Sequence, residues 1–302
     1  MLAPMPIQEA LAWASKAAGG AAVDSVEPLG VAGGLWLLRL GGAMQLCLRL
    51  GDPQDATMRS RFETEAAALV LMQDHQLAVP RLVAADLAGT VDGQLALLRT
   101  VRTGSSLIPH DPRPARLRAL GAAAAAIHSI TPPAQAGLAV RTGPIADTNF
   151  TPAMSSPEPG TAVSDARRRI AGLDRPSEAH VLVHGDLWQG NILWVEDRLS
   201  GILDWDRAGI GPAGIDLGYL RFDVVMTYGL AAADEVLAGW EEARGQQAQD
   251  VAYWDVVAAL AVPPDLLEWL HFWHDQGRPD LTAQTLNARR DEFVEAALPD
   301  LG

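Results

Sequence analysis

Runs of apolar residues divided by glycine-rich turns fill the first hundred positions and predict a small antiparallel sheet. The expected strands cover 23–29, 35–40, 44–50, 81–85 and 94–99. Between the third and fourth strands, after the break Gly51-Asp52-Pro53, apolar residues recur at helical spacing and predict a helix over 56–74. The first twenty residues predict a short amphipathic helix, because Glu9 and Lys16 interrupt the apolar run.

The rest of the chain has a mainly helical pattern. An alanine-rich helix is expected over 115–129, followed by a Pro-, Gly-, Ser- and Thr-rich loop over 131–164. After a helix over 166–173, short strands are expected at 181–183, 192–195 and 199–203. From Ala213 onward the pattern is helical, with a break at Pro263-Pro264.

Charge and cysteine content narrow the classes of function. The chain has 302 residues and a formal net charge of -14, which does not suit a nucleic-acid backbone or an anionic membrane. An acidic surface suits a cationic small substrate, although solubility alone also explains it. Cys47 is the only cysteine and lies in an apolar run, so we expect a buried side chain, no internal disulfide and a cytoplasmic protein.

The segment that carries chemistry is His184-Gly185-Asp186-Leu187-Trp188-Gln189-Gly190-Asn191. It lies between two predicted strands and has the H-x-D-x-x-x-x-N spacing of kinase catalytic loops. Asp204 follows Asp186 by eighteen residues, and a predicted hairpin fills the gap. A polar turn capped by Asp186 is the simpler interpretation, but the loop, its flanking strands and the later Asp204-Trp205-Asp206 together favour chemistry.

Phosphoryl transfer requires these residue types. A carboxylate must accept the proton of the attacking hydroxyl, and we assign Asp186 to that role. Mg²⁺ prefers oxygen ligands, so we assign Asn191 and Asp204 to the metal. For His184 we favour a packing role, with its ring behind the loop and bonded to backbone.

The segment from His184 to Asp216 resembles the aminoglycoside phosphotransferase and choline kinase superfamily. The similarity rests on His184-Gly185-Asp186, Asn191, Asp204-Trp205, Gly211 and Asp216-Leu217. It implies an α+β, protein-kinase-like, two-lobed fold with ATP or GTP between the lobes. The N-terminal lobe, residues 1–100, would be an antiparallel sheet with one long helix. A hinge over 101–106 would lead to a larger, mainly helical lobe over 107–302.

The resemblance also implies a nucleotide site. Gly33 and Gly34 belong to the expected loop over the phosphates, although the segment is not G-x-G-x-x-G and equally suits a plain hairpin turn. Arg49 stands where kinases have a lysine for the α and β phosphates. The segment 97–104 would be the hinge that contacts adenine, and we place Arg99 and Val101 in the nucleotide site.

A helix glutamate should steady Arg49. Glu63 and Glu65 compete for this role, but only Glu65 falls within the apolar stripe of its helix. A buried carboxylate is costly unless it is paired, so we pair Glu65 with Arg49. Asp216 either accepts backbone bonds from the catalytic loop or simply suits the start of its helix.

The acceptor is not encoded in these motifs. Acidic and aromatic residues gather over 254–275 and suit either a cationic or sugar-like acceptor or a packed core. Fructosamine, choline, methylthioribose, homoserine and macrolide kinases remain open, since Leu187-Trp188 also resembles the fructosamine kinase loop. A kinase-shaped binding protein without turnover and, more remotely, a metal-dependent hydrolase are the alternatives of a different class.

Overall fold

The computed structural model describes residues 8–29, 34–145 and 161–301. They form two compact units. The first runs to Thr103 and also takes in Ala134–Leu138 and Gly201–Asp206; the second holds Gly104–Pro133, Ala139–Ser200 and the chain from Arg207. Gly33 lies outside the described residues.

The first unit is built on a five-stranded antiparallel sheet of order β1-β2-β3-β5-β4. Its elements are α1 (Gln8–Ala17), β1 (Val23–Pro28), β2 (Leu35–Leu40), β3 (Met44–Gly51), α2 (Ala56–Met72), β4 (Leu82–Val91) and β5 (Gln94–Thr100). The expected elements are all present, and β4 continues beyond its predicted end at Ala85. In this extension the Asp86 carboxylate accepts hydrogen bonds from the backbone N–H groups of Ala88 and Val91, where the register with β5 shifts.

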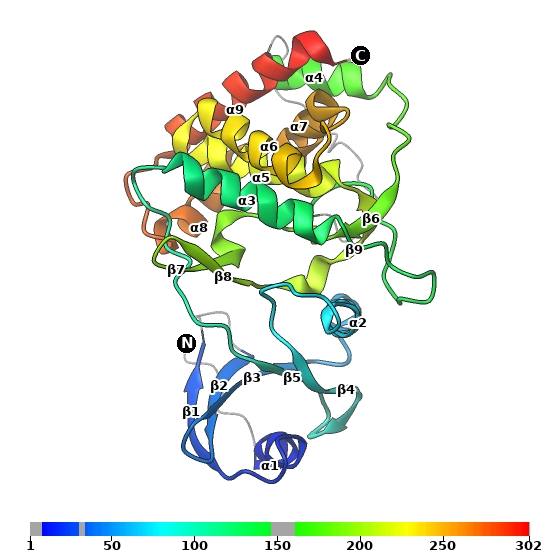
Figure 1. Ribbon diagram of the computed structural model, residues 1–302, viewed down its shortest axis with the longest axis vertical. Helices are drawn as coiled ribbons and strands as arrows, with labels where there is room; N and C mark the ends of the chain where they lie inside the picture. The colour runs from blue at the N-terminus through cyan, green and yellow to red at the C-terminus, as the bar shows by residue number, and fades with distance from the viewer. Residues whose placement is uncertain (1–7, 30–33, 146–160, 302) are drawn as a thin grey trace. The chain divides into compact units, whose positions relative to one another are not determined.

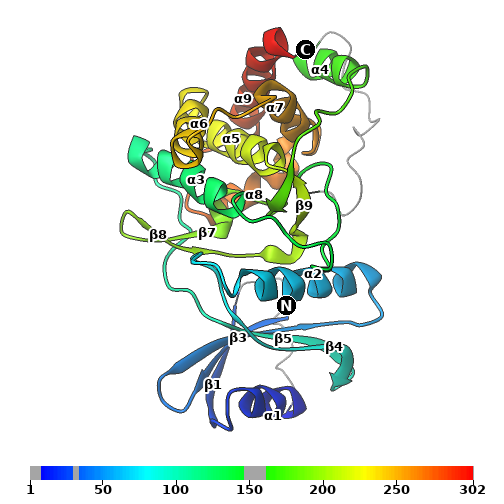
Figure 2. The same ribbon diagram turned by 45° about the vertical axis from the view of Figure 1, so that its right-hand side comes forward.

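The two faces of this sheet have different partners, and Figures 1 and 2 show α1 and α2 on opposite sides of it. One face packs Leu46, Leu48 and Leu98 with Ala10 and Ala14 of α1. On the other face, Leu95 and Leu97 pack against Phe62 and Ala66 of α2. Burying a side chain such as Phe62 contributes about 2 kcal/mol.

The start of α2 follows from its cap. Asp55 lies just before the helix, and its carboxylate accepts hydrogen bonds from the backbone N–H groups of Thr57 and Met58 at 2.9 and 3.1 Å. These bonds satisfy donors that the first turn leaves without a partner. The cap therefore fixes where the helix begins and which of its residues face the sheet.

The second unit is mainly helical, with two small two-stranded sheets, β6-β9 and β7-β8, among its described residues. Its helices are α3 (Pro114–Ile127), α4 (Ala162–Ile170), α5 (Gly214–Tyr228), α6 (Ala231–Arg244), α7 (Val251–Leu260), α8 (Leu270–Asp275) and α9 (Ala283–Ala297). Its strands are β6 (His180–Val183), β7 (Ile192–Val195), β8 (Arg198–Ile202) and β9 (Gly209–Pro212). Short 3₁₀ turns of this unit cover Gln189–Asn191, Leu266–Trp269 and Leu298–Asp300, and a fourth, Trp205–Arg207, begins in the part of the first unit that ends at Asp206.

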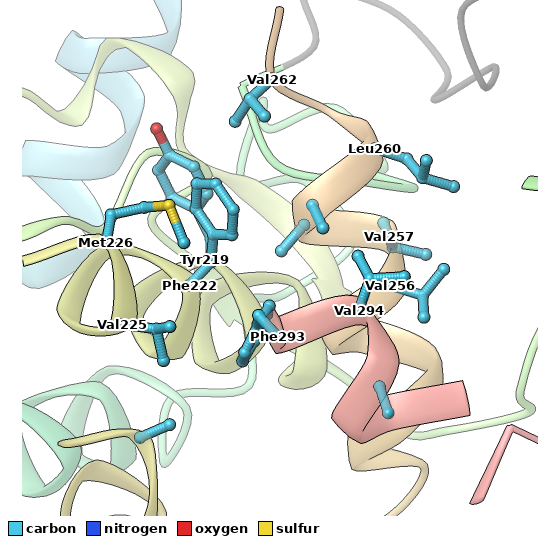
Figure 3. Close-up of a cluster of buried hydrophobic side chains, with 14 of the residues drawn as sticks. Tyr219, Phe222, Val225, Met226, Val256, Val257, Leu260, Val262, Phe293 and Val294 are labelled. Carbon is cyan, nitrogen blue, oxygen red and sulfur yellow. The ribbon is translucent and has the colours of Figure 1, made fainter. Parts of the chain in front are cut away.

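Helix α5 is the centre of this unit, and every residue from Gly214 to Thr227 is buried. Figure 3 shows side chains of α5, α7 and α9 meeting in one apolar cluster that includes Phe222, Val257 and Phe293. Within this interior, Arg221 of α5 is bonded to both carboxylate oxygens of Asp255 on α7. A central helix that is buried all round can hold functional groups on more than one of its faces.

Strand β9 is the element that the sequence pattern did not predict. Its residues are Gly209-Ile210-Gly211-Pro212, which carry no strand periodicity. The strand forms because β6 pairs along it from His180 to Val183. A Cβ at Gly211 would lie 2.9 Å from the carbonyl oxygen of Arg141, so close backbone approach explains that glycine.

None of the described helices is long and apolar enough to cross a bilayer.

Candidate active site

In the first unit, Glu65 joins two arginines that come from neighbouring strands. Nη1 of Arg49 donates to Oε2 of Glu65 at 2.5 Å, and the guanidinium of Arg99 pairs with the other carboxylate oxygen. Glu65 is fully buried in α2, whereas Glu63 is exposed. The structure therefore contains the Arg49–Glu65 pair that the apolar stripe predicted.

Strand register explains why the two arginines meet. Arg49 lies opposite Leu97, and Cys47 lies opposite Arg99, so side chains two residues apart share the face that α2 covers. The Arg49 guanidinium also lies 4.8 Å from the ring centre of Phe62. Cys47 is buried on this face and is unpaired, as expected.

The segment Gly201–Asp206 brings a second carboxylate to Arg49. Nη2 of Arg49 donates to Oδ2 of Asp206 at 2.9 Å, and Asp206 is buried. Two residues earlier, Asp204 has φ 61, an uncommon conformation for a residue with a side chain. Aspartate adopts this left-handed conformation more readily than most residues, and Asp92 and Asp250 share it.

Gly34 lies at the start of β2, next to the strand position paired with Arg49. Its carbonyl accepts from the backbone N–H of Leu50 at 2.7 Å, and its φ is +79. A Cβ on Gly34 would stand 2.8 Å from the Leu50 carbonyl oxygen, so only glycine fits without a shift. Val101 follows the end of β5 and has no regular secondary structure.

In the second unit, the loop between β6 and β7 has a fixed and unusual shape. Gly185 has φ +81, and a Cβ there would lie 2.1 Å from the carbonyl oxygen of Arg207. The carbonyl of Gly185 accepts from the backbone N–H of Ile145 at 2.7 Å. This packing sets the backbone on which Asp186 stands, and the Asp186 side chain is partly exposed.

Asp216 fastens the start of this loop. Its carboxylate accepts from the backbone N–H groups of His184 and Gly185 at 2.6 and 2.8 Å, and it is completely buried. Burial alone raises the pKa of Asp216, but the hydrogen bond from His128 and the loop backbone outweigh it, and the pKa lies below its ordinary value. Of the two roles left open for Asp216, the structure shows the brace.

His128 and Trp240 form a hydrogen-bonded series with Asp216. Nε1 of Trp240 donates to Nδ1 of His128 at 2.9 Å, and Nε2 of His128 lies 3.2 Å from Asp216. Because an indole N–H can only donate, Nδ1 of His128 accepts, and Nε2 carries the proton toward the carboxylate. His184 is likewise fully buried and accepts at Nδ1 from the backbone N–H of Asp186 at 3.3 Å, which is the packing role expected of it.

The end of the loop is held by a second carboxylate of α5. Asp223 accepts from both the backbone and the side chain of Gln189 at 3.0 Å. Burial raises the pKa of Asp223 to about 6, against the hydrogen bonds from Gln189 that lower it. Two residues after Gln189, Nδ2 of Asn191 donates a hydrogen bond to the carbonyl oxygen of Asp186 at 2.9 Å. The side-chain amide oxygen of Asn191 is therefore the atom suited to a cation.

Several of these supports were not predicted from the sequence: His128, Asp206, Asp223 and Trp240. Asp223 lies in the apolar run of α5 and His128 ends an alanine-rich helix, so a polar residue within an apolar stripe was the available signal.

Burial also raises the pKa of Tyr219, and the charges of Asp186 and Asp223 raise it further. Asp216, Tyr219 and Asp223 are spaced three and four residues apart, so they lie on one face of α5. The hydrogen bonds of Asp216 and Asp223 to the loop come from this face.

A sequence comparison places these motifs in a known family. The model described as the phosphotransferase enzyme family matches residues 35–260. Viomycin phosphotransferase of Streptomyces vinaceus is 38% identical over 84 residues, an alignment that spans 26% of this chain and 28% of that relative. The chain therefore matches under a third of the length of this curated relative.

Solved structures with the same fold extend over nearly the whole chain. A macrolide 2'-phosphotransferase from Brachybacterium faecium has a TM-score of 0.60 at 18% identity and covers 97% of this chain and 99% of its own. A protein described as a putative aminoglycoside phosphotransferase, from Ralstonia eutropha, has a TM-score of 0.62 at 16% identity, with 98% of each chain covered. An aminoglycoside phosphotransferase solved with ADP and hygromycin B has a TM-score of 0.57 at 16% identity, covering 95% and 98%. These similarities confirm the kinase-like fold class expected from the sequence.

Proposed function

The chain belongs to the phosphotransferase enzyme family, and from this premise we propose that it transfers the γ-phosphoryl group of Mg-bound ATP or GTP to a hydroxyl group of a small molecule. The observation that carries the proposal is the loop around Asp186, which buried carboxylates hold at both ends. A loop fastened in this way keeps its aspartate in one place, and phosphoryl transfer depends mainly on positioning and charge.

Asp186 is the proposed general base. Its carboxylate accepts the proton of the acceptor hydroxyl as the hydroxyl oxygen forms a bond to the γ-phosphorus. The bond between the γ-phosphorus and the β–γ bridging oxygen breaks, and the nucleoside diphosphate leaves. General-base assistance of this kind contributes about 10²- to 10⁴-fold to a rate.

Asn191 and Asp204 are the proposed protein ligands of Mg²⁺. Both offer the hard oxygen donors that Mg²⁺ prefers, and the amide nitrogen of Asn191 is already committed to the Asp186 carbonyl. The described ranges contain no group of three or more His, Cys, Asp or Glu residues placed to hold a metal ion. Mg²⁺ suits such a setting, because it is usually held by one or two protein groups together with substrate phosphates. Bound there, it would neutralise charge on the phosphates.

Arg49 is the proposed phosphate ligand of the first unit. A guanidinium has five N–H donors, and the bonds to Glu65 and Asp206 occupy only part of this set. The pairing fixes the orientation of the guanidinium and offsets its charge. Gly33 and Gly34 are the proposed phosphate-loop residues, and Arg99 and Val101 remain proposed nucleotide contacts, Arg99 through its shared partner Glu65.

Acceptor and nucleotide can be tested together. ADP or GDP release is measured with MgATP and, separately, MgGTP against macrolides, aminoglycosides including hygromycin B, viomycin, choline, methylthioribose, homoserine and fructosamines. D186N serves as the blank. Turnover on one compound that disappears in folded D186N supports the proposal and identifies the acceptor. A wild-type protein that binds neither nucleotide would instead point to a kinase-shaped binding protein.

A further inference from the structure

A cavity of about 210 Å³ lies in the second unit, between α4, α7 and α9. Figures 1 and 2 show α4 next to α7 and α9, and the three helices are in contact. The volume is below the range of about 300–1,000 Å³ that is typical for drug-sized ligands, so it suits a molecule of only a few non-hydrogen atoms. Among the described residues that line the cavity, none is proposed to take part in phosphoryl transfer.

Part of the cavity lining is apolar. Val163 of α4, Leu260 at the end of α7 and Val262 just after it line the cavity, and all three are buried. They belong to the same hydrophobic cluster as Phe222, and Figure 3 labels Leu260 and Val262. Water in contact with such side chains finds few hydrogen-bond partners, whereas a short hydrocarbon group is favoured there.

The charged part of the lining is positive. Arg167 of α4 and Arg290 of α9 are its cations, and Asp291 is the only carboxylate among the described residues that line the cavity. Two positive charges and one negative charge give a formal charge of +1, in a chain whose net charge is -14. The side chain of Arg290 is 11% exposed and that of Asp291 is 44% exposed, so solvent screens the carboxylate more than the guanidinium.

The surroundings of Arg290 do not favour its charge. Burial lowers the pKa of Arg290, the carboxylates of Asp291 and Asp265 oppose this shift, and the charge of Arg167 adds to it. The two guanidinium groups therefore repel each other. An anion bound between them would offset this repulsion, as a carboxylate does for any partly buried cation.

The hydrogen bonds of Arg290 leave one donor for a ligand. Nη1 donates to the carbonyl oxygens of Pro263 and Pro264 at 3.3 and 2.6 Å, which holds the guanidinium against the break after α7. Nε is buried and has no hydrogen-bond acceptor in the described part of the chain, and Oδ1 of Asp291 is 3.8 Å away, too far for a hydrogen bond. A buried donor of this kind destabilises a protein unless a ligand or a water molecule supplies the acceptor.

We propose that this cavity binds a small carboxylate that carries a short apolar group. The carboxylate lies between Arg167 and Arg290 and accepts the hydrogen bond that Nε of Arg290 has to donate. Its planar shape matches a guanidinium group, and its single charge matches a lining of +1 better than the charge of a phosphate does. The hydrocarbon part covers the buried side chains of Val163, Leu260 and Val262. This inference goes beyond the proposed phosphotransfer and does not depend on it, because the two involve different residues.

Butyrate is the probe, because it joins a carboxylate to a propyl group. Calorimetry measures its Kd for the full chain, and thermal unfolding is followed in sodium butyrate and in sodium chloride of equal ionic strength. We expect saturable binding that raises the Tm above its value in sodium chloride. Formate lacks the propyl group and should bind more weakly on the order of tenfold. Inorganic phosphate should also bind more weakly, and butylammonium, which has the opposite charge, should not bind.

The variants R167Q and R290K are compared with R168Q. Arg168 is next to Arg167 on α4, but its side chain is 75% exposed, pairs with Asp165 and is not among the lining residues. R167Q and R168Q remove the same charge, so only the position of the charge differs. The butyrate Kd should rise on the order of tenfold in R167Q and R290K and stay unchanged in R168Q. Each variant is measured with and without butyrate, so a loss of stability in R290K does not obscure the effect of the ligand.

The opposite results would overturn the proposal. An absence of saturable butyrate binding, or the same butyrate Kd in R167Q as in R168Q, would show that the cavity is not a carboxylate site. Phosphate that binds more tightly than butyrate, and less tightly in R167Q, would make the site one for a different class of anion. Equal binding of formate would exclude the role of the apolar lining, and equal stabilisation by butylammonium would exclude the role of the two arginines.

Discussion

Arg49 on β3 and Glu65 on α2 form an ion pair whose carboxylate is completely buried. Glu65 also pairs with Arg99, and Arg49 also bonds Asp206, so two carboxylates and two guanidinium groups offset one another. A buried charge is tolerated only with such partners. The pair therefore fixes the direction of a guanidinium that is still partly exposed, at 19% of its side-chain area.

Removing the charge of Glu65 should destabilise the protein. E65Q leaves the guanidinium of Arg99 without its carboxylate partner, and breaking a buried pair typically costs about 3–5 kcal/mol. E63Q is the matched control, because Glu63 lies two residues away on the same helix but is exposed. Urea unfolding should show a loss of about 3 kcal/mol for E65Q and less than about 0.5 kcal/mol for E63Q. Equal stability of the two variants would show that the pair contributes nothing.

Replacing Arg49 with lysine should weaken nucleotide binding more than stability. Arg49 reaches Glu65 and Asp206 through separate nitrogens, and a single ammonium group cannot reproduce that fork. Losing one charge-assisted bond lowers affinity on the order of tenfold. Calorimetry with MgATP compares R49K with R39K, since Arg39 is an exposed arginine of β2 paired with Glu27. Unchanged affinity in R49K would remove Arg49 from the phosphate site.

Much of the first unit could be predicted because its signals are local. Strand runs, glycine turns and the apolar stripe of α2 each depend on neighbouring residues, and the choice of Glu65 over Glu63 followed from that stripe. The contact between Arg49 and Asp206 could not be predicted in the same way. The two residues are 157 positions apart, and only the folded chain brings them together. Strand β9 escaped prediction for a similar reason, since its pairing with β6 supplies what its own sequence lacks.

Gly185 should tolerate no side chain. In G185A the new Cβ would combine the strain of a positive φ, about 1 kcal/mol, with an overlap on the Arg207 carbonyl that adds about 1–3 kcal/mol. G245A separates these effects, because Gly245 has φ +65 but a Cβ added there would meet nothing within 4 Å. Thermal unfolding should show a clearly larger loss for G185A, together with a lower kcat. Similar losses in both variants would mean that the close approach to Arg207 is unimportant.

Asp223 should make stability depend on pH between about 4 and 6. Its pKa is raised from 3.8 to about 6 in the folded chain, so the folded state keeps a proton that the unfolded state has lost. The contribution of Asp223 to the free energy of unfolding is fully present below about pH 4. It is lost as the pH rises through 6, and the total loss is about 3 kcal/mol. In D223N that part of the pH dependence should disappear. Urea unfolding of both proteins at several pH values checks this, and parallel curves would contradict the assignment.

The loop that carries the proposed base and the proposed metal ligand could be recognised because its spacing is local: Asp186 and Asn191 lie in one short segment. The groups that hold the loop were harder to find. Asp216 and Asp223 come from α5, Trp240 comes from α6, and His128 directly follows α3, so their roles depend on how the helices pack. The exposure of the aromatic residues over 254–275 was the least predictable part, because sequence spacing alone did not distinguish the buried Trp273 from the exposed Phe272 next to it.

Transfer of labelled γ-phosphate from ATP to an acceptor, compared between the wild-type protein and D186N, tests the central claim most directly. Circular dichroism and calorimetry with MgATP should show that D186N is folded and binds nucleotide. The account predicts a labelled acceptor with the wild type and a rate lower by about 10²- to 10⁴-fold with D186N. A folded D186N protein that labels the acceptor at the wild-type rate would contradict the role of Asp186 and, with it, the proposed mechanism.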